Sequence, residues 1–403
     1  MSAKPKENRI PSRADRDWTT IPFGEFATLQ RGKDLTKSQF RDGPFPVGGS
    51  NGIIGYHDTA IANGPGITVG RSGSAGKVTY FEQDFWPHNT ALYVKDFHGN
   101  DPLFTRYFFS HLDLSRFKTG ASVPTLDRNT FKMLPVAIPP LPEQKRIAHI
   151  LSTVQQAIEA QERIIQTTTD LKKALMHKLF TEGMRNEPQK QTDVGPIPVS
   201  WKLCKVGDVA RIQSGGTPAR DTPENWSEGT IPWVKTGEID YCIIQDTEEK
   251  ITPDGLSNSA ARLFPAGTLL MAMYGQGITR GRVALLAIEA ATNQACASIT
   301  PADEAEVSSR FLYYWFEYNY ENLRKLGHGA NQRNMNAALI RSFPLAHPTA
   351  KEQERIVSSL AAIDEKMEVG QRKNSDLSNL FQTLLHQLMT AQLRVEIPGS
   401  KST

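Results

Sequence analysis

The chain has 403 residues, of which 39% are hydrophobic and 22% are charged, so it holds enough apolar material for two to three globular domains. This composition excludes collagen-like, low-complexity and fully disordered proteins, and no apolar run approaches the roughly 18–20 residues of a membrane-spanning helix. The sequence shows no secretory signal peptide, and its three scattered cysteines are too few for a disulfide framework, so we expect a cytoplasmic protein. Because 46 basic residues face 43 acidic ones, a nucleic-acid surface would need local segregation of charge.

The first half of the chain predicts a tail, a mixed globular unit and a long helix. Short apolar runs between Gly and Pro residues predict strands at 67–70 and 77–81, and an amphipathic, aromatic-rich stretch predicts a helix over 103–114. Trp18 is expected to anchor the core at the start of the unit. The predicted segments are the N-terminal tail 1–17, the globular unit 18–142 and the helix 143–183.

The second half follows the same order. Strands are predicted at 268–272 and 281–286, an aromatic-rich helix is predicted over 309–323, and Trp201 opens the unit. Many short strands with few helices favour an α+β class for both units. The predicted segments are the linker 184–200, the globular unit 201–351, the helix 352–393 and the C-terminal tail 394–403.

These two halves are copies of one plan. In both, a Pro-containing segment leads into the long helix through Glu-Gln-x-x-Ile, at 143–147 and at 352–356. Upstream, both units open with Trp, then Gly and an acidic residue, then Gln-x-Gly, at 18–32 and at 201–215. A duplicated α+β unit, each copy followed by a long helix, therefore covers nearly the whole chain.

Both long helices carry a heptad stripe of the coiled-coil type. In the first helix the stripe holds Ile147, Leu151, Val154, Ile158, Gln161, Ile165, Thr168, Lys172, Leu175 and Leu179. In the second helix it holds Ile356, Leu360, Ile363, Met367, Gly370, Asn374, Leu377, Phe381, Leu384 and Leu388. The polar residues in the middle would fix the register of the pair. The alternative is two surface helices that each pack on their own domain.

Helix length predicts how the pair is oriented. A helix over 143–183 spans about 60 Å, whereas the linker 184–200 reaches at most about 56 Å when fully stretched. An antiparallel pair avoids the long return path, and it would hold the two units apart at opposite ends with pseudo-twofold symmetry. Such symmetry suits duplex DNA, which offers twofold-related half-sites.

This plan resembles the specificity (S) subunits of type I restriction–modification systems. The resemblance covers about Trp18 to Leu393 and rests on the order, duplication and spacing of its motifs. Those motifs are Pro139–Ile147 at the helix entry, its degenerate second copy Pro348–Gln353, and the stretches Gly48–His57, Gly195–Trp201 and Gln213–Pro218.

The resemblance implies a fold and a function. The fold would be two α+β target-recognition domains linked and separated by a long antiparallel two-helix coiled coil. The S subunit reads a bipartite double-stranded DNA target, scaffolds two adenine methyltransferase subunits and two ATP-dependent restriction subunits, and is itself non-catalytic. S-adenosylmethionine, ATP and Mg would then bind to the partner subunits, and this chain would hold no cofactor, metal or catalytic residue.

A search for chemistry in the residues themselves leaves two alternatives open. No phosphate-binding loop or dinucleotide fingerprint is complete, since Gly76-Lys77 and Gly275–Arg280 each lack required residues. Glu248-Glu249-Lys250 has the local acid-x-Lys form of a metal-dependent nuclease, although a solvated charge run is favoured. A nuclease with duplicated DNA-binding units is therefore one rival, and a coiled-coil adaptor that binds only protein is the other.

DNA contacts are expected from Gly-rich cationic loops, because base edges and phosphates are bound by Arg, Lys, Asn, Gln and hydroxyl groups. The loop 70–77 and the loop 274–282 occupy equivalent places in the two units. Ordinary solvated turns are the alternative reading. The candidates in the first unit are Arg31, Lys33, Ser50, Asn51, Arg71, Ser72 and Lys77. The candidates in the second unit are Thr217, Arg220, Lys235, Tyr274, Gln276, Arg280, Arg282, Gln332 and Arg333.

Overall fold

The computed structural model describes residues 18–119, 125–275, 278–326 and 335–395, and the chain divides into two compact units. Unit 1 comprises Met1–Arg163 with Arg372–Thr403, and unit 2 comprises Ile164–Gln371. Each unit is therefore discontinuous in sequence: it holds the beginning of one long helix and the end of the other.

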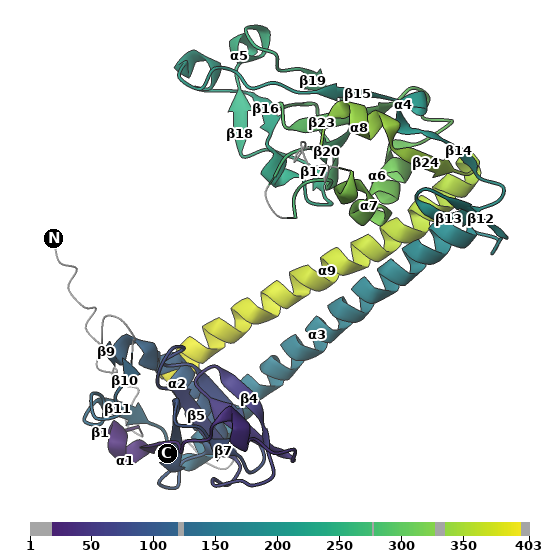
Figure 1. The fold of residues 1–403 in the computed structure, drawn as a ribbon. Coiled ribbons are helices and arrows are strands. Elements are labelled where there is room, and N and C mark those ends of the chain that lie inside the picture. The colour runs from purple at the N-terminus through teal and green to yellow at the C-terminus, as the bar shows by residue number, and fades with distance from the viewer. Residues whose placement is uncertain (1–17, 120–124, 276–277, 327–334, 396–403) are drawn as a thin grey trace. The chain divides into compact units, whose positions relative to one another are not determined.

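Unit 1, whose strands are drawn in purple and blue in Figure 1, is built on two main sheets. The larger, antiparallel sheet has the order β2-β8-β5-β6, with β2 at Thr28–Arg31, β5 at Gly66–Gly70, β6 at Val78–Phe81 and β8 at Ala91–Asp96. The smaller sheet has the order β4-β3-β7, with β3 at Phe45–Gly49, β4 at Gly52–His57 and β7 at Trp86–Pro87. Two further antiparallel pairs are β1 (Thr19–Pro22) with β11 (Pro135–Ile138) and β9 (Lys118–Thr119) with β10 (Thr125–Leu126). Strands β3 and β7 run parallel, so their carboxyl ends meet at one edge.

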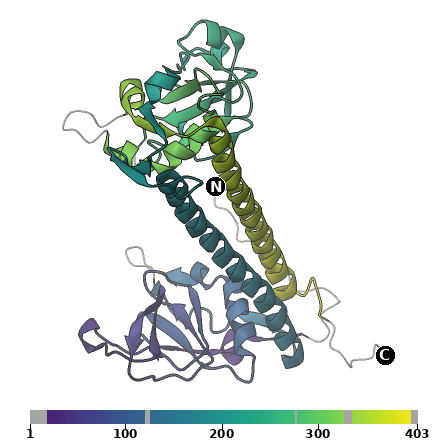
Figure 2. The same ribbon diagram turned by 90° about the vertical axis from the view of Figure 1, so that its right-hand side faces the viewer.

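An aromatic core holds the elements of unit 1 together. Helix α1 (Phe23–Phe26) and helix α2 (Pro102–Leu112) bury their rings against each other, and Phe23 stacks on Phe109 with ring centroids 5.2 Å apart. Asp101 caps α2 by accepting the amide of Phe104 at 2.8 Å, and Pro at the first helical position lacks the amide that would need a partner. Figure 2 shows the strands of unit 1 beside the first turns of the long helix α3 (Leu141–Glu182), whose apolar face enters the same core.

Unit 2 repeats this layout with additions. Its larger sheet has the order β15-β23-β20-β21-β17, with β15 at Ala210–Ser214, β17 at Ile243–Ile244, β20 at Leu269–Ala272, β21 at Val283–Leu286 and β23 at Cys296–Pro301. Its smaller sheet has the order β18-β16-β22-β19, with β16 at Ile231–Val234, β18 at Glu249–Ile251, β19 at Leu263–Phe264 and β22 at Ala290–Thr292. Strand β14 (Lys202–Lys205) pairs with β24 (Pro344–His347), as β1 pairs with β11 in unit 1. Two pairs of described strands are parallel here: β16 with β22, as β3 with β7 in unit 1, and β17 with β21.

The helices of unit 2 are α4 (Val206–Val209), α5 (Pro253–Ser257), α6 (Ser309–Tyr318), α7 (Tyr320–Lys325) and α8 (Ala337–Ser342). The predicted single helix 309–323 is divided, because α6 ends at Tyr318 and the side chain of its C-cap, Asn319, donates to the Trp315 carbonyl at 3.0 Å. The predicted linker also holds structure, since β12 (Gln189–Thr192) and β13 (Gly195–Pro198) form a hairpin. Trp18 and Trp201 are both buried in their cores, as predicted.

The two long helices are α3 and α9 (Ala350–Met389), and they pack antiparallel within each unit. In unit 1 the beginning of α3 shares a core with the end of α9, through Ile147, Leu151, Leu385 and Leu388. In unit 2 the end of α3 shares a core with the beginning of α9, through Met176, Leu179, Ile356 and Leu360. Every predicted seam residue of both helices is buried or half-buried. The predicted fold class, two α+β units with two long antiparallel helices, is confirmed.

The repeated Glu-Gln pair makes corresponding contacts in the two units. Gln144 Oε1 accepts a hydrogen bond from the amide of Asp101 at 2.9 Å, and Gln353 Oε1 accepts from the amide of Ser308 at 3.0 Å. Asp101 and Ser308 are the N-caps of α2 and α6. The motif therefore joins the start of each long helix to the main helix of its α+β unit.

The neighbouring glutamates bind the chain that follows the end of the other long helix. The buried Glu143 carboxylate accepts two hydrogen bonds from Arg394, at 2.9 and 3.1 Å. Glu352 accepts from the backbone amide of Met184 at 3.0 Å. Both glutamates thus tie α3 to α9 inside one unit.

A buried ion cluster adds a polar contact between α3 and α9 in unit 2. Lys172 Nζ lies 2.6 Å from a carboxylate oxygen of Glu317 and 2.7 Å from one of Asp364. The hydroxyl of Tyr314 donates to the other oxygen of Asp364 at 2.8 Å. This seam position was predicted to fix register, and here it joins both long helices to α6. In the described part of the chain, every helix is too short or too polar to cross a membrane.

Candidate nucleic-acid interface

One hairpin is built in the same way in the two units. In unit 1 the amide of Gly70 donates to the Lys77 carbonyl and the amide of Gly76 donates to the Gly70 carbonyl, both at 2.8 Å. In unit 2 the equivalent bonds join the Ala272 amide to the Arg282 carbonyl at 3.0 Å and the Gly281 amide to the Ala272 carbonyl at 2.8 Å. Gly76 and Gly281 share a left-handed φ of 92° and 89°, which only glycine adopts at little cost. The two predicted Gly-rich loops therefore occupy equivalent places.

In unit 1 the segment from His88 to Thr90 gathers the candidate residues. The Thr90 carbonyl accepts the amide of Arg71 at 2.9 Å, and its hydroxyl accepts the amide of Ser50 at 3.3 Å. Lys77 Nζ donates to the carbonyl and to the side-chain oxygen of Asn51, at 2.8 and 2.9 Å. The hairpin and the loop after β3 thus form one polar surface.

The end of β2 joins the same surface of unit 1. Lys33 donates its amide to the Pro87 carbonyl at 2.9 Å, and both Arg31 and Lys33 have exposed side chains. A Cβ on Gly32 would lie 2.2 Å from the His88 carbonyl oxygen, so glycine is required for this close approach. Ser72 is half-buried and forms a bridge to Thr125. All seven candidates of unit 1 therefore lie either on the β5–β6 hairpin or on segments that hydrogen-bond to β7 and the turn after it, or to that hairpin.

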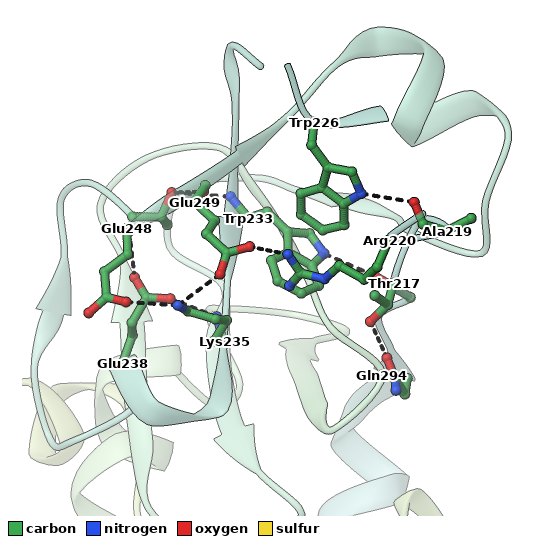
Figure 3. Close-up of polar contacts among 12 residues, drawn as sticks. Thr217, Ala219, Arg220, Trp226, Trp233, Lys235, Glu238, Glu248, Glu249 and Gln294 are labelled. Carbon is green, nitrogen blue, oxygen red and sulfur yellow. Dashed lines mark hydrogen bonds and ion pairs between the residues drawn. The ribbon is translucent and has the colours of Figure 1, made fainter. Parts of the chain in front are cut away.

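In unit 2, three of the candidates line one recess of about 510 Å³ at the carboxyl ends of β16 and β22. Figure 3 shows them with the side chains around them. The recess is lined by Thr217, Arg220, Trp233, Lys235, Thr236, Gly237, Glu238, Glu248 and Asn293.

Arg220 is held in a fixed position by aromatic rings and a carboxylate. Its guanidinium carbon lies 3.8 Å from the ring centroid of Trp226 and 4.8 Å from that of Trp233, and it forms an ion pair with Glu249. The Trp226 indole donates to the Ala219 carbonyl at 2.9 Å, which pins the loop that carries Arg220. Stacking of this kind suits a planar guanidinium and keeps it oriented.

Lys235 lies between two glutamates. Its Nζ is 2.8 Å from Glu248 and 3.0 Å from Glu249, and these hydrogen bonds raise the pKa of Lys235 above its ordinary value. Hydrogen bonds from Arg220 first, and then from Lys235, lower the pKa of Glu249. Lys235 and Glu249 are therefore both charged at neutral pH. Figure 3 shows the four side chains as a chain of ion pairs, Glu248–Lys235–Glu249–Arg220.

The floor of the recess is tightly packed backbone. The Trp233 indole donates to the Gly216 carbonyl at 3.0 Å, and the Thr217 hydroxyl hydrogen-bonds to Gln294. A Cβ on Gly216 would lie 2.2 Å from the carbonyl carbon of Ala260, so this position also needs glycine. The predicted Gln-Ser-Gly-Gly-Thr-Pro stretch thus positions Thr217 at the rim.

The remaining described candidates of unit 2 lie outside the lining of this recess. Arg280 is only 9% exposed and donates to the Arg324 carbonyl at 3.1 Å, so its guanidinium faces the protein. Arg282, the structural counterpart of Lys77, forms an ion pair with Asp240. Tyr274 is exposed. Gln276, Gln332 and Arg333 lie outside the described residues.

Several residues that line the recess or contact its lining were not among the candidates: Trp226, Trp233, Glu238, Glu248, Glu249 and Gln294. Glu248 and Glu249 were read as a solvated charge run, but they pair with cations that are distant in sequence. Two tryptophans seven residues apart, Trp226 and Trp233, were the one available signal. Pairing between distant loops leaves no local pattern.

The acid-x-Lys segment of the nuclease alternative is engaged in ion pairs. Glu249 lies between Arg220 and Lys235, and Lys250 lies 3.1 Å from Asp246. Within the described residues, no group of three or more His, Cys, Asp or Glu side chains is arranged to hold a metal ion. The segment serves to orient cations in this structure.

The architecture defines a class of protein. A crystal structure of the S subunit of a type I restriction–modification system from M. genitalium superposes with a TM-score of 0.67 at 16% identity, and the match covers 98% of this chain and 99% of that one. At this identity the likeness shows the fold: two α+β units joined by two long helices, as in type I specificity subunits.

Sequence comparison leads to the same class. The chain is 29% identical over 208 residues to the type I restriction enzyme MjaIX specificity subunit of Methanocaldococcus jannaschii. The matched region covers 50% of this chain and 47% of the relative. It is 23% identical over 333 residues to the putative MjaX specificity subunit of the same organism, covering 80% of this chain and 76% of that one. This chain therefore spans about half the length of the first relative and three quarters of the second.

The family model for the type I restriction modification DNA specificity domain matches residues 15–168 and again residues 198–379. The chain belongs to this family and carries two copies of its domain. The predicted internal repeat and the predicted resemblance are confirmed.

Proposed function

We propose that this chain is the DNA specificity subunit of a type I restriction–modification complex and that it reads a bipartite target in double-stranded DNA. Each unit would bind one half of the target through its candidate interface. The observation that carries this proposal is the equivalence of the β5–β6 and β20–β21 hairpins, each beside a pair of parallel strand ends, in a family of DNA specificity domains. Polar and cationic side chains on such loops suit contacts with base edges and phosphates.

The long helices would set the unread spacer between the two halves of the target. Each of them begins in one unit and ends in the other, so their length links one reading surface to the next. The seam is apolar at both ends and carries the Lys172 cluster, which supports a pair of defined register.

The proposed partners supply the chemistry. Two methyltransferase subunits would sit on the helices, flip an adenine out of the duplex and methylate it with S-adenosylmethionine. Two restriction subunits would translocate and cleave with ATP and Mg. The chain itself would be non-catalytic and would act in the cytoplasm, where it meets the DNA.

The test is to co-express the chain with its methyltransferase partner and to map methylated adenines in the host DNA. We expect a motif of two short specific halves separated by a gap of constant length. A continuous motif, or methylation without sequence preference, would contradict the proposal.

Two further assays separate the alternatives. The purified chain, incubated with Mg²⁺ and plasmid, should leave the plasmid intact, because we propose that the chain is non-catalytic. Cleavage of the plasmid without partner subunits would support the nuclease alternative. The chain bound to its methyltransferase should retain target DNA in preference to scrambled DNA, and equal retention of both would support the protein-only adaptor.

A further inference from the structure

The ion-pair chain in the recess of unit 2 has a chemistry that phosphate binding does not explain. Two cations, Arg220 and Lys235, line the recess with two carboxylates, Glu238 and Glu248. A third carboxylate, Glu249, pairs with both cations beside the recess. The carboxylates outnumber the cations, so a phosphate would meet net repulsion here. A mixed set of charged acceptors and donors instead suits the edge of a base pair, which presents both kinds of partner.

The three carboxylates have different tasks. Glu238 accepts the backbone amides of Lys235 and Glu248, at 2.7 and 3.0 Å, so it holds two loops together. Glu249 is shared by Arg220 and Lys235. Glu248 has only Lys235 as a side-chain partner in the described part of the chain, and its side chain is 72% exposed. Glu248 is thus the carboxylate with acceptor capacity to spare at the mouth of the recess.

Lys235 and Glu248 together match the major-groove edge of one kind of base pair. In a C·G pair the cytosine N4 amino group lies beside the guanine O6 oxygen, hydrogen-bonded at about 2.9 Å. The separation of 2.8 Å between Lys235 Nζ and the Glu248 carboxylate oxygen is nearly the same. A carboxylate beside the cytosine amino group would accept a hydrogen bond from it, and an ammonium beside the guanine oxygen would donate one to it.

Resting on the proposed function, we propose that Lys235 and Glu248 read one C·G base pair in the half-site of unit 2. Glu248 accepts from cytosine N4, and Lys235 donates to guanine O6 and N7. An A·T pair also places an amino group beside a carbonyl oxygen, but the thymine methyl replaces the second acceptor on that side. The ammonium therefore gains more contacts at C·G.

The surrounding residues keep the pair in position before DNA arrives. Glu238 holds the Lys235 loop through its amide, and Glu249 holds the Lys235 ammonium from the protein side. Glu249 is itself held by Arg220, which stacks on Trp226 and Trp233. Such preorganisation lowers the entropy lost on binding and favours discrimination between bases.

The experiment maps methylated adenines produced by the chain with its methyltransferase partner, for wild type and Glu248→Gln. We expect the wild-type half-site of unit 2 to contain an invariant C·G pair. In Glu248→Gln, discrimination at that one position should fall by about tenfold to a hundredfold, because a neutral amide also donates and tolerates other bases. The variant should fold, because the side chain is largely exposed.

A matched control is Glu306→Gln, which removes the carboxylate of another exposed ion pair of unit 2, Lys202–Glu306, outside the recess. This control should leave the motif unchanged. The half-site of unit 2 is identified as the half that Asn51→Ala in unit 1 leaves intact.

Three results would overturn the inference: a motif unaltered by Glu248→Gln, an A·T pair at the altered position, or equal weakening at every position of the target. A wild-type motif without two halves would instead overturn the proposed function, so the two failures are distinguishable.

Discussion

Removal of Lys172 offers a direct test of how the two long helices are held in unit 2. The change is Lys172→Met, which keeps an unbranched apolar side chain, one heavy atom shorter, but removes its charge. The Lys172 side chain is 9% exposed and those of Glu317 and Asp364 are 18% and 33% exposed. The variant therefore leaves two carboxylates in a poorly solvated seam without their cation.

The expected cost follows from this geometry. Removing one partner of a buried ion pair destabilises proteins by about 3–5 kcal/mol, because the remaining charge is left uncompensated. Asp364 keeps the Tyr314 hydroxyl and is a third exposed, so Glu317 should account for most of the loss. One of its oxygens already lacks a hydrogen-bond partner in the described structure.

The cost should depend on pH with a definite sign. Burial raises the pKa of Glu317, and Lys172 partly opposes this increase, so the pKa rises further in Lys172→Met. A carboxyl group with a raised folded-state pKa binds its proton more tightly when folded. Its ionisation therefore costs stability as pH rises from the unfolded-state pKa towards the folded one. The deficit of the variant should be full at pH 8 and smaller at pH 5.

The assay is urea unfolding of the chain followed by tryptophan fluorescence at both pH values. Lys173→Met, one residue along the same helix and exposed, is the control and should change stability by less than about 0.5 kcal/mol. Glu317→Gln added to Lys172→Met should recover part of the loss. A deficit below about 1 kcal/mol, or one that does not change with pH, would refute the reasoning.

Three other predictions concern the interface and the helices. Inserting seven residues, about 10.5 Å of helix, within both 161–168 and 370–377 keeps the heptad seam and should lengthen the spacer of the methylated motif by about 3 bp. An unchanged spacer in an active complex would show that the length of the helices does not set the spacer. Arg71→Ala should relax only the half-site of unit 1 if Arg71 contacts bases, whereas uniform weakening with a smaller salt dependence would make it a phosphate contact. Gly216→Ala should lower the stability of the chain by about 1–3 kcal/mol in urea unfolding, because its Cβ meets backbone at 2.2 Å, whereas Gly237→Ala, which meets nothing within 4 Å, should not.

The parts of the fold that were predictable are those with a repeating pattern. The heptad stripe repeats every seven residues, and all of its positions, including Gln161 and Lys172, are buried or half-buried. Strands β5, β6, β20 and β21 were predicted within one or two residues, because Gly and Pro mark their ends. Asn319 was not recognised as a helix end, since its capping bond to Trp315 belongs to that turn alone.

The candidate site was predictable only in part. Thr217, Arg220 and Lys235 were all candidates, but the sequence did not indicate that they line the same recess as Glu248. Arg280 was a candidate for DNA contact on its Gly-rich loop, and its guanidinium donates to the Arg324 carbonyl. The sequence alone does not show whether an arginine side chain faces solvent or donates to a backbone carbonyl.

The amino-acid sequence alone determined that the chain is a duplicated α+β unit with two long heptad helices, because duplication, heptads and turn residues are local patterns that survive without a structure. Tertiary structure alone decided which charges meet: Lys235 with Glu248 and Glu249, Lys172 with Glu317 and Asp364, Glu143 with Arg394. These partners lie between 13 and about 250 residues apart in the chain, and a Coulomb interaction depends on distance in space, which only the packing of the core establishes.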